Sequence, residues 1–108
     1  MRDFKEETEA WIASLIKDEV MKDSSDIDEL KFSRPGGLKY TQVGGPIDWD
    51  AAQKALELDS WEYDDGFGCQ EFCGFITFKN SNMWLQRKEY DGSEWWGIFK
   101  KPKLGFYE

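Results

Sequence analysis

The stretch EYDGSEWW, residues 89–96, predicts a β-hairpin, and this hairpin decides how the rest of the chain is interpreted. Asp-Gly between two runs rich in aromatic residues is the strongest short-range signal for such a turn. Successive side chains of a strand point to opposite faces of a sheet, so Trp95 and Trp96 must face opposite ways. A sheet with one solvated face does not need a tryptophan on both.

The pairing of this hairpin depends on the length of its turn. A two-residue turn places Glu89 directly opposite Glu94, and like charges at such positions destabilise a sheet. A three-residue loop with its glycine in the left-handed conformation pairs Lys88 with Glu94 instead. The same loop places Arg87 opposite Trp95. We expect the three-residue loop, because it replaces a repulsion by an ion pair and a cation–π contact worth about 1 kcal/mol together.

The sequence around the hairpin extends it into an antiparallel meander. Asp65-Gly66 and residues 80–82 supply two further turns between segments rich in aromatic and β-branched residues. The second predicted strand is long for one uninterrupted strand, so Gly68 and Gly74 are candidates for a bulge or bend. The four predicted strands cover residues 58–64, 67–79, 83–90 and 94–100.

The first half of the chain is predicted to contain two helices. Apolar residues recur at helical spacing from Asp3 to about Lys22, which predicts one amphipathic helix. Residues 49–57 predict a second, short helix with Asp48 as its N-cap. Between the helices we expect a short helical turn from Ser25 through Leu30 and an extended segment over residues 38–43.

This order of elements predicts a single α+β domain over residues 1–108, with both helices packed on a four-stranded antiparallel meander. The length is typical of one domain and suffices to bury one core. The predicted parts are the helical part at about 3–57, the meander at about 58–100 and a C-terminal tail at 101–108.

Two explanations are open for the adjacent tryptophans. In the first, both faces of the sheet are covered, one by the long helix and the other by the glycine-rich segment together with the C-terminal tail. In the second, one face keeps an exposed patch of Trp, Tyr and Arg, the residue types that dominate protein–protein hot spots. The sheet is then a binding surface as well as part of the core.

Composition argues against several kinds of function. The chain has 22 acidic and 14 basic residues, a formal net charge of −8, so we expect no direct binding of nucleic acid, which needs clustered Lys and Arg. It has no histidine, so we expect no catalytic residue, no metal site and no cofactor. The acidic N-terminus and the absence of a long apolar run lead us to expect a cytoplasmic protein without membrane contact.

Two segments carry a resemblance to known proteins. YDDGFGCQEFCGFITF, residues 63–78, and MWLQRKEYDGSEWW, residues 83–96, resemble a group of small, largely uncharacterised bacteriophage and bacterial proteins. That group combines a Gly-x-Gln-Glu-aromatic-x-Gly strand with a closing EYDGSEWW. The resemblance covers residues 62–97, about a third of the chain, and it implies a phage or prophage setting in a bacterial host without implying a catalytic residue.

These observations predict a non-enzymatic interaction protein of phage type that inhibits a host nucleic-acid-handling or defence complex. Its acidic segment, residues 48–71, would occupy a basic surface of a host protein that normally holds phosphates, and aromatic anchors would add affinity. The predicted partner-binding residues are Glu62, Tyr63, Asp64, Asp65, Arg87, Tyr90, Asp91, Glu94, Trp95 and Trp96.

Three alternatives stay open at this level. The acidic residues are equally explained as a solvated surface that keeps the protein soluble. An aromatic-walled pocket between the sheet and the glycine loops would instead bind a nucleotide-like ligand. An open sheet face or edge would make the protein a self-associating phage accessory component, a homo-oligomer.

Overall fold

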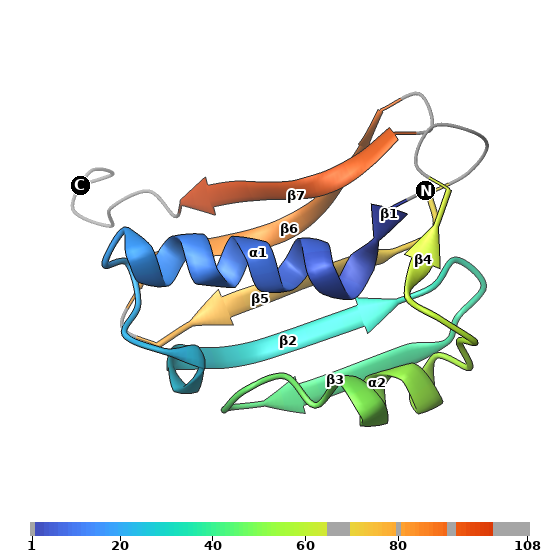
Figure 1. Ribbon diagram of the computed structural model, residues 1–108, viewed down its shortest axis with the longest axis horizontal. Helices are drawn as coiled ribbons and strands as arrows, with labels where there is room; N and C mark the ends of the chain where they lie inside the picture. The colour runs from blue at the N-terminus through green and yellow to red at the C-terminus, as the bar shows by residue number, and fades with distance from the viewer. Residues whose placement is uncertain (1, 65–69, 80, 91–92, 101–108) are drawn as a thin grey trace, which may run out of the picture.

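The fold is α+β, with two helices on one face of a five-stranded antiparallel sheet (Figure 1). The computed structural model describes residues 2–64, 70–79, 81–90 and 93–100. A separate ladder of two strands lies beside the start of the long helix. The predicted fold class is therefore confirmed, whereas the arrangement of the strands differs from the prediction.

The five-stranded sheet has the order β3-β2-β5-β6-β7, and each neighbouring pair is antiparallel. Its strands are β2 (Ile27–Ser33), β3 (Lys39–Val43), β5 (Cys73–Phe78), β6 (Met83–Tyr90) and β7 (Ser93–Lys100). The two-stranded ladder pairs β1 (Arg2–Asp3) with β4 (Glu62–Tyr63).

Each helix begins after an aspartate that caps it. The helix α1 (Phe4–Lys17) follows Asp3, whose carboxylate accepts the N–H of Glu6 at 2.9 Å. The helix α2 (Trp49–Ala55) follows Asp48, whose carboxylate accepts the N–H of Ala51 at 3.0 Å. This bond confirms the predicted N-cap of the second helix. It satisfies a backbone N–H that the first turn of a helix leaves without a partner.

The long helix ends at Lys17, before the predicted end near Lys22. Glu19 takes a φ of 61°, outside the helical region, and the chain turns there. This turn brings Met21, which is 5% exposed, into the core. Burial of that side chain therefore decides where the helix stops.

The predicted four-stranded meander is only roughly right. We expected a helical turn over 25–30, but a 3₁₀ turn covers only Ser24–Asp26, and β2 begins directly after it. The predicted first strand, 58–64, contributes only Glu62–Tyr63, and these residues pair with β1 instead of the main sheet. The main sheet takes β2 and β3 in its place.

The alternation of side chains in β2 explains this difference. Leu30 and Phe32 are fully buried, while Lys31 between them and Ser33 after them point to the other face. A strand places both apolar side chains on the face that the helices cover, whereas a helical turn would separate them.

The core lies between the sheet and the two helices, and Phe4 is at its centre. Phe4 is 0% exposed and is the first residue of α1. The rings with centroids within 6.2 Å of its own are those of Phe32, Trp49, Trp61, Phe72 and Trp96. One ring of α1 therefore contacts α2, two strands and the segments that precede β4 and β5.

The hairpin β6–β7 does not have the register that we predicted. Glu89 pairs with Glu94, Lys88 with Trp95 and Arg87 with Trp96. This is the register of the two-residue turn, so the predicted three-residue loop is wrong; the turn residues 91–92 lie outside the described residues. The repulsion we invoked does not arise, because the Glu94 side chain is buried against Arg87.

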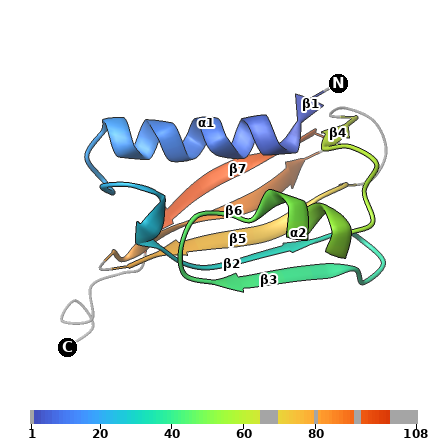
Figure 2. The same ribbon diagram turned by 60° about the horizontal axis from the view of Figure 1, so that its bottom comes forward.

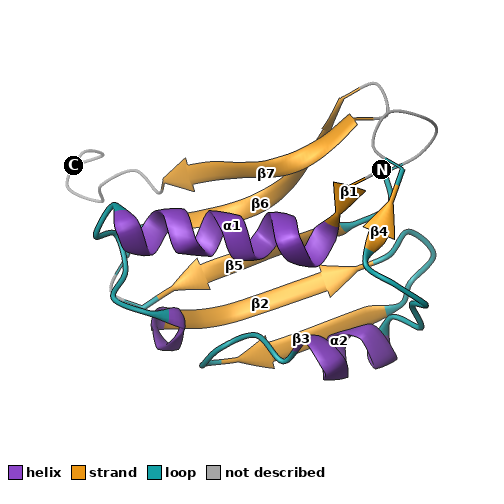
Figure 3. Cartoon of the chain, in the orientation of Figure 1, coloured by secondary structure: helices purple, strands orange, loops and turns teal. Residues whose placement is uncertain are grey.

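Both helices cover the same face of the sheet, as the turned view shows (Figure 2) and as the colouring by secondary structure makes plain (Figure 3). Trp96 points to this inner face and is 1% exposed. Trp95 points to the opposite face, which we call the outer face, and no described helix lies on it. Among the described residues the outer face is uncovered, as the second explanation for the adjacent tryptophans expects. The C-terminal tail at 101–108, which the first explanation placed on this face, lies outside the described residues.

Gly74 is the point at which β5 and β2 come closest. A Cβ at this position would clash with the backbone carbonyl oxygen of Lys31. The register between these strands shifts elsewhere, between Ile27 and Leu30, so the predicted role of Gly74 in a bulge is not what the structure shows. Gly68, the other candidate, lies outside the described residues.

We predict that Gly74→Ala lowers the free energy of unfolding by roughly 1–3 kcal/mol, because the added methyl group forces two backbones apart. Urea denaturation monitored by circular dichroism measures the change. Gly97→Ala is the matched control: its Cβ would clash with the flexible side chain of Lys88, which can move away, and would make an ordinary van der Waals contact with Phe99. Equal losses in the two variants would contradict the close-approach explanation.

Candidate functional site

Four of the predicted partner-binding residues lie in the interior of the protein. Tyr63, Arg87, Glu94 and Trp96 are 2%, 6%, 0% and 1% exposed, respectively. Each of these side chains faces the core from a different strand position, so the four come together in the interior and not at the surface. They therefore offer no contact area to a partner in this conformation.

Three of these residues form a polar cluster with Glu7 of α1, and we call Arg87, Glu94, Glu7 and Tyr63 the Arg87 cluster. Nη2 of Arg87 lies 2.7 Å from Oε1 of Glu94, and Nη1 lies 3.0 Å from Oε2 of Glu7. Nη2 also donates to the Tyr63 hydroxyl at 3.1 Å, and that hydroxyl donates to Glu7 at 2.6 Å. A buried guanidinium is thus matched by two carboxylates.

Glu94 also holds the backbone that leads into β5. Its carboxylate accepts the N–H of Glu71 at 2.6 Å and the N–H of Phe72 at 3.0 Å. Each of these bonds satisfies a backbone donor that burial would otherwise leave without a partner. A side chain of β7 therefore positions a segment about twenty residues earlier in the chain.

Burial and ion pairing set the protonation states of this cluster. Burial works against the charge of Arg87, but its bonds to Glu94 and Tyr63 and the charge of Glu7 raise the pKa of the guanidinium above its ordinary value. Burial and the bond to Glu7 raise the pKa of Tyr63 to about 12. Arg87 is therefore charged and Tyr63 is neutral at physiological pH.

The remaining predicted site residues are distributed differently. Glu62 and Asp64 are exposed, and Tyr90 is 76% exposed at the end of β6. Asp65 and Asp91, at the two predicted turns, lie outside the described residues. Trp95 is the predicted aromatic anchor that the structure leaves partly accessible.

The outer face carries partly exposed aromatic rings that the sequence analysis did not single out. Directly paired residues of neighbouring strands share a face, so the registers place Phe75, Trp84 and Phe99 on the same side as Trp95. The rings of Trp84 and Phe99 stack with centroids 5.5 Å apart. A sheet face of this kind is unusual for a surface in contact only with water.

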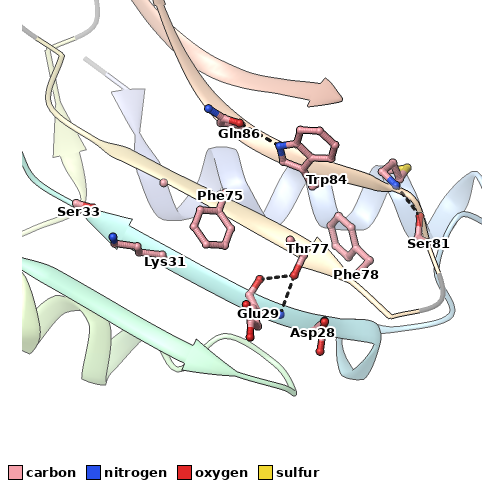
Figure 4. A pocket seen from close by; sticks show the side chains of 12 residues that line it. Asp28, Glu29, Lys31, Ser33, Phe75, Thr77, Phe78, Ser81, Trp84 and Gln86 are labelled. Carbon is pink, nitrogen blue, oxygen red and sulfur yellow. Dashed lines mark hydrogen bonds between the residues drawn. The ribbon is translucent and has the colours of Figure 1, made fainter. Parts of the chain in front are cut away.

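A shallow groove runs across this face over β2, β5 and β6 (Figure 4). Its volume is about 650 Å³. Phe75 and Trp84 form apolar walls, and Gln86, directly opposite Phe75 in the ladder between β5 and β6, accepts the indole N–H of Trp84 at 3.0 Å. The helix α1 lies behind the sheet in this view, so the groove belongs to the outer face alone.

Lys88 lies across β7 on the outer face. Its ammonium group is 6.0 Å from the ring centroid of Trp95 and 5.5 Å from that of Phe99. Gly97, between these two rings in the strand, leaves the space that the Lys88 stem occupies. A cation is thus held directly over two aromatic rings.

The charges of the outer face are opposite in sign to those of the chain as a whole. Among its described strand positions there are three lysines, Lys31, Lys39 and Lys88, and two acidic residues, Asp28 and Glu29. Glu29 lies at one end of the groove, where Asp28 forms the rim. The lysines lie toward the other end, beside Phe75 and Trp95, so the outer face has a basic, aromatic end.

The described residues contain no group of three His, Cys, Asp or Glu side chains that could hold a metal ion. No helix among them is both long and apolar enough to cross a membrane. Comparisons with family models, with curated proteins and with solved structures found no match to this chain. The chemistry of the protein surface is therefore what indicates a function.

We predict that Glu94→Gln lowers the free energy of unfolding by about 3–5 kcal/mol, because it removes one of the two carboxylates that neutralise buried Arg87. Urea denaturation measures this loss. Glu62→Gln, which makes the same chemical change on an exposed side chain, should change stability by less than about 0.5 kcal/mol. Similar losses of unfolding free energy in both variants would show that the buried ion pair contributes no more to stability than an exposed carboxylate does.

We predict a loss of stability as the pH rises from about 10 toward 12, from ionisation of Tyr63. Its pKa is about 12 in the folded protein and about 10 in an unfolded chain, so its contribution is complete below pH 10 and is lost above it. Unfolding free energies at pH 8 to 11 should fall more steeply for the wild type than for Tyr63→Phe. Exposed Tyr90→Phe should keep the wild-type slope, and a wild-type slope in Tyr63→Phe contradicts this assignment.

Proposed function

We propose that this chain is a non-enzymatic binding protein and that the outer face of its sheet is the contact surface. The observation that carries the proposal is the combination of partly exposed rings, a groove and lysines on the face that no described helix covers. The interior does not need these rings, because the core is complete on the other side. Exposing them to water costs free energy, which a partner would recover.

The chemistry of the outer face defines the partner that fits it. Phe75, Trp84 and Trp95 offer flat apolar surfaces, and Lys31 with Lys88 offers positive charge next to them. A partner with planar or apolar groups and negative charge is complementary to both features. This proposal keeps the interaction protein expected from the sequence and places its contact on a different surface.

A contact between the acidic surface and a basic host protein stays a prediction, with Glu62 and Asp64 as its exposed described members. The phage or prophage setting, the inhibition of a host complex and the cytoplasmic location also stay predictions, and the resemblance of residues 62–97 is what supports them. The outer face is the better-supported contact, because rings and opposite charges coincide there.

Capture from a bacterial lysate tests the choice of surface. An outer-face variant, Phe75→Ser with Trp95→Ser, should lose the partners that the wild type retains, whereas an acidic-surface variant, Glu62→Gln with Asp64→Asn, should keep them. Circular dichroism and urea denaturation verify that both variants are folded. Partners retained by the outer-face variant and lost by the acidic-surface variant would overturn the proposal.

A further inference from the structure

The rings and lysines of the outer face are arranged in pairs. Lys31 is directly opposite Phe75 in the ladder between β2 and β5. Lys88 is directly opposite Trp95 in the ladder between β6 and β7, with its ammonium group over the ring. Each of these two partly exposed rings therefore has a lysine directly opposite it in the neighbouring strand.

This pairing matches the chemistry of a polynucleotide, in which each flat base accompanies one negatively charged phosphate. We propose, on the basis of the function proposed above, that the outer face binds single-stranded nucleic acid. Bases stack on Phe75 and, once the flexible Lys88 side chain turns from the ring to a phosphate, on Trp95. Phosphates lie next to Lys31, Lys39 and Lys88. Aromatic side chains on which bases stack, with cations beside them for the phosphates, are how proteins bind single strands without sequence preference; here the lysines lie at the basic end of the outer face, beyond the acidic end of the groove.

The shape of the surface favours a strand over a single nucleotide or a duplex. The groove is shallow and spans three strands of the sheet, and the rings continue beyond it onto β7. A free nucleotide would bury little of its surface on such a face. The bases of a duplex are stacked on one another, and so they cannot lie on protein rings.

The net charge of −8 does not oppose this inference at short range. It led us to expect no direct nucleic-acid binding, but a net charge does not describe one face. Phosphates at the outer face lie within a Debye length, about 8 Å at physiological salt, of the lysines there, while more distant carboxylates are screened. Glu29 and Asp28 at the other end of the groove orient the strand toward the lysines.

The small number of cations predicts a weak dependence on salt. Each lysine–phosphate contact with a single strand contributes about 0.7 to the fall of log K with log salt. The lysines at positions 31, 39 and 88 then give a slope of about −2. This value distinguishes a defined contact on one face from nonspecific binding by a strongly basic protein.

The test is the fluorescence anisotropy of a labelled ten-nucleotide oligothymidylate, titrated with the full chain at several salt concentrations. We expect binding with a slope near −2, and weaker binding to a duplex of the same length. Phe75→Ala should weaken binding about 5- to 150-fold, the loss of one stacked base. Trp95→Ala should do the same.

Charge variants keep the inference testable if a ring variant fails to fold. Lys31→Glu on the outer face should weaken binding, while Lys5→Glu, an equal change of net charge on exposed α1, should leave it within about twofold. Glu29→Gln should strengthen it. Equal effects of Lys31→Glu and Lys5→Glu would overturn the inference, since only net charge would then matter.

The two proposals can fail separately. If oligothymidylate does not bind, but the outer-face variant still loses its lysate partner after nuclease treatment, the outer face is a contact for another molecule and only the nucleic-acid inference is overturned. An oligoglutamate peptide that binds as tightly as the oligonucleotide would identify an acidic protein segment as the occupant. If oligothymidylate does not bind and the outer-face variant keeps every wild-type partner, both proposals are overturned.

Discussion

The buried ion pair between Arg87 and Glu94 is the interaction on which the rest of the structure depends. A charge in the interior must be matched by an opposite charge and by hydrogen bonds, or the chain will not bury it. Matching Arg87 requires Glu94 from β7, Glu7 from α1 and the hydroxyl of Tyr63 from β4. One guanidinium thus determines how a helix, a short ladder and the main sheet meet.

The same pair determines which tryptophan is in the core. With Arg87 opposite Trp96, the indole of Trp96 lies inside, and its N–H donates to the Thr8 hydroxyl of α1 at 2.8 Å. Strand alternation then places Trp95 on the outer face, where Lys88 lies over it. The composition of the candidate binding surface is therefore a consequence of how a charge is neutralised in the core.

The two faces of the sheet carry different kinds of residues. The inner face holds the aromatic core and the Arg87 cluster, and these account for the stability of the fold. The outer face contributes little to that core, and its rings and lysines form the contact surface that we propose. Acidic side chains cover much of the rest of the surface, which strengthens the contrast between the basic end of the outer face and its surroundings.

Local signals in the sequence predicted both helices, the Asp48 cap, the strand over residues 83–90 and all but the first residue of the strand over 93–100. Helical spacing, caps and Asp-Gly turns act between near neighbours, so a sequence reveals them without a partner element. The strand β2, the register of the hairpin and the choice of outer face came only from the tertiary structure. They depend on contacts between residues far apart in the sequence. In the hairpin, for example, Glu94 is buried against the backbone of residues 71–72, and the energy of these bonds outweighs the repulsion from Glu89 that the local pairing suggested.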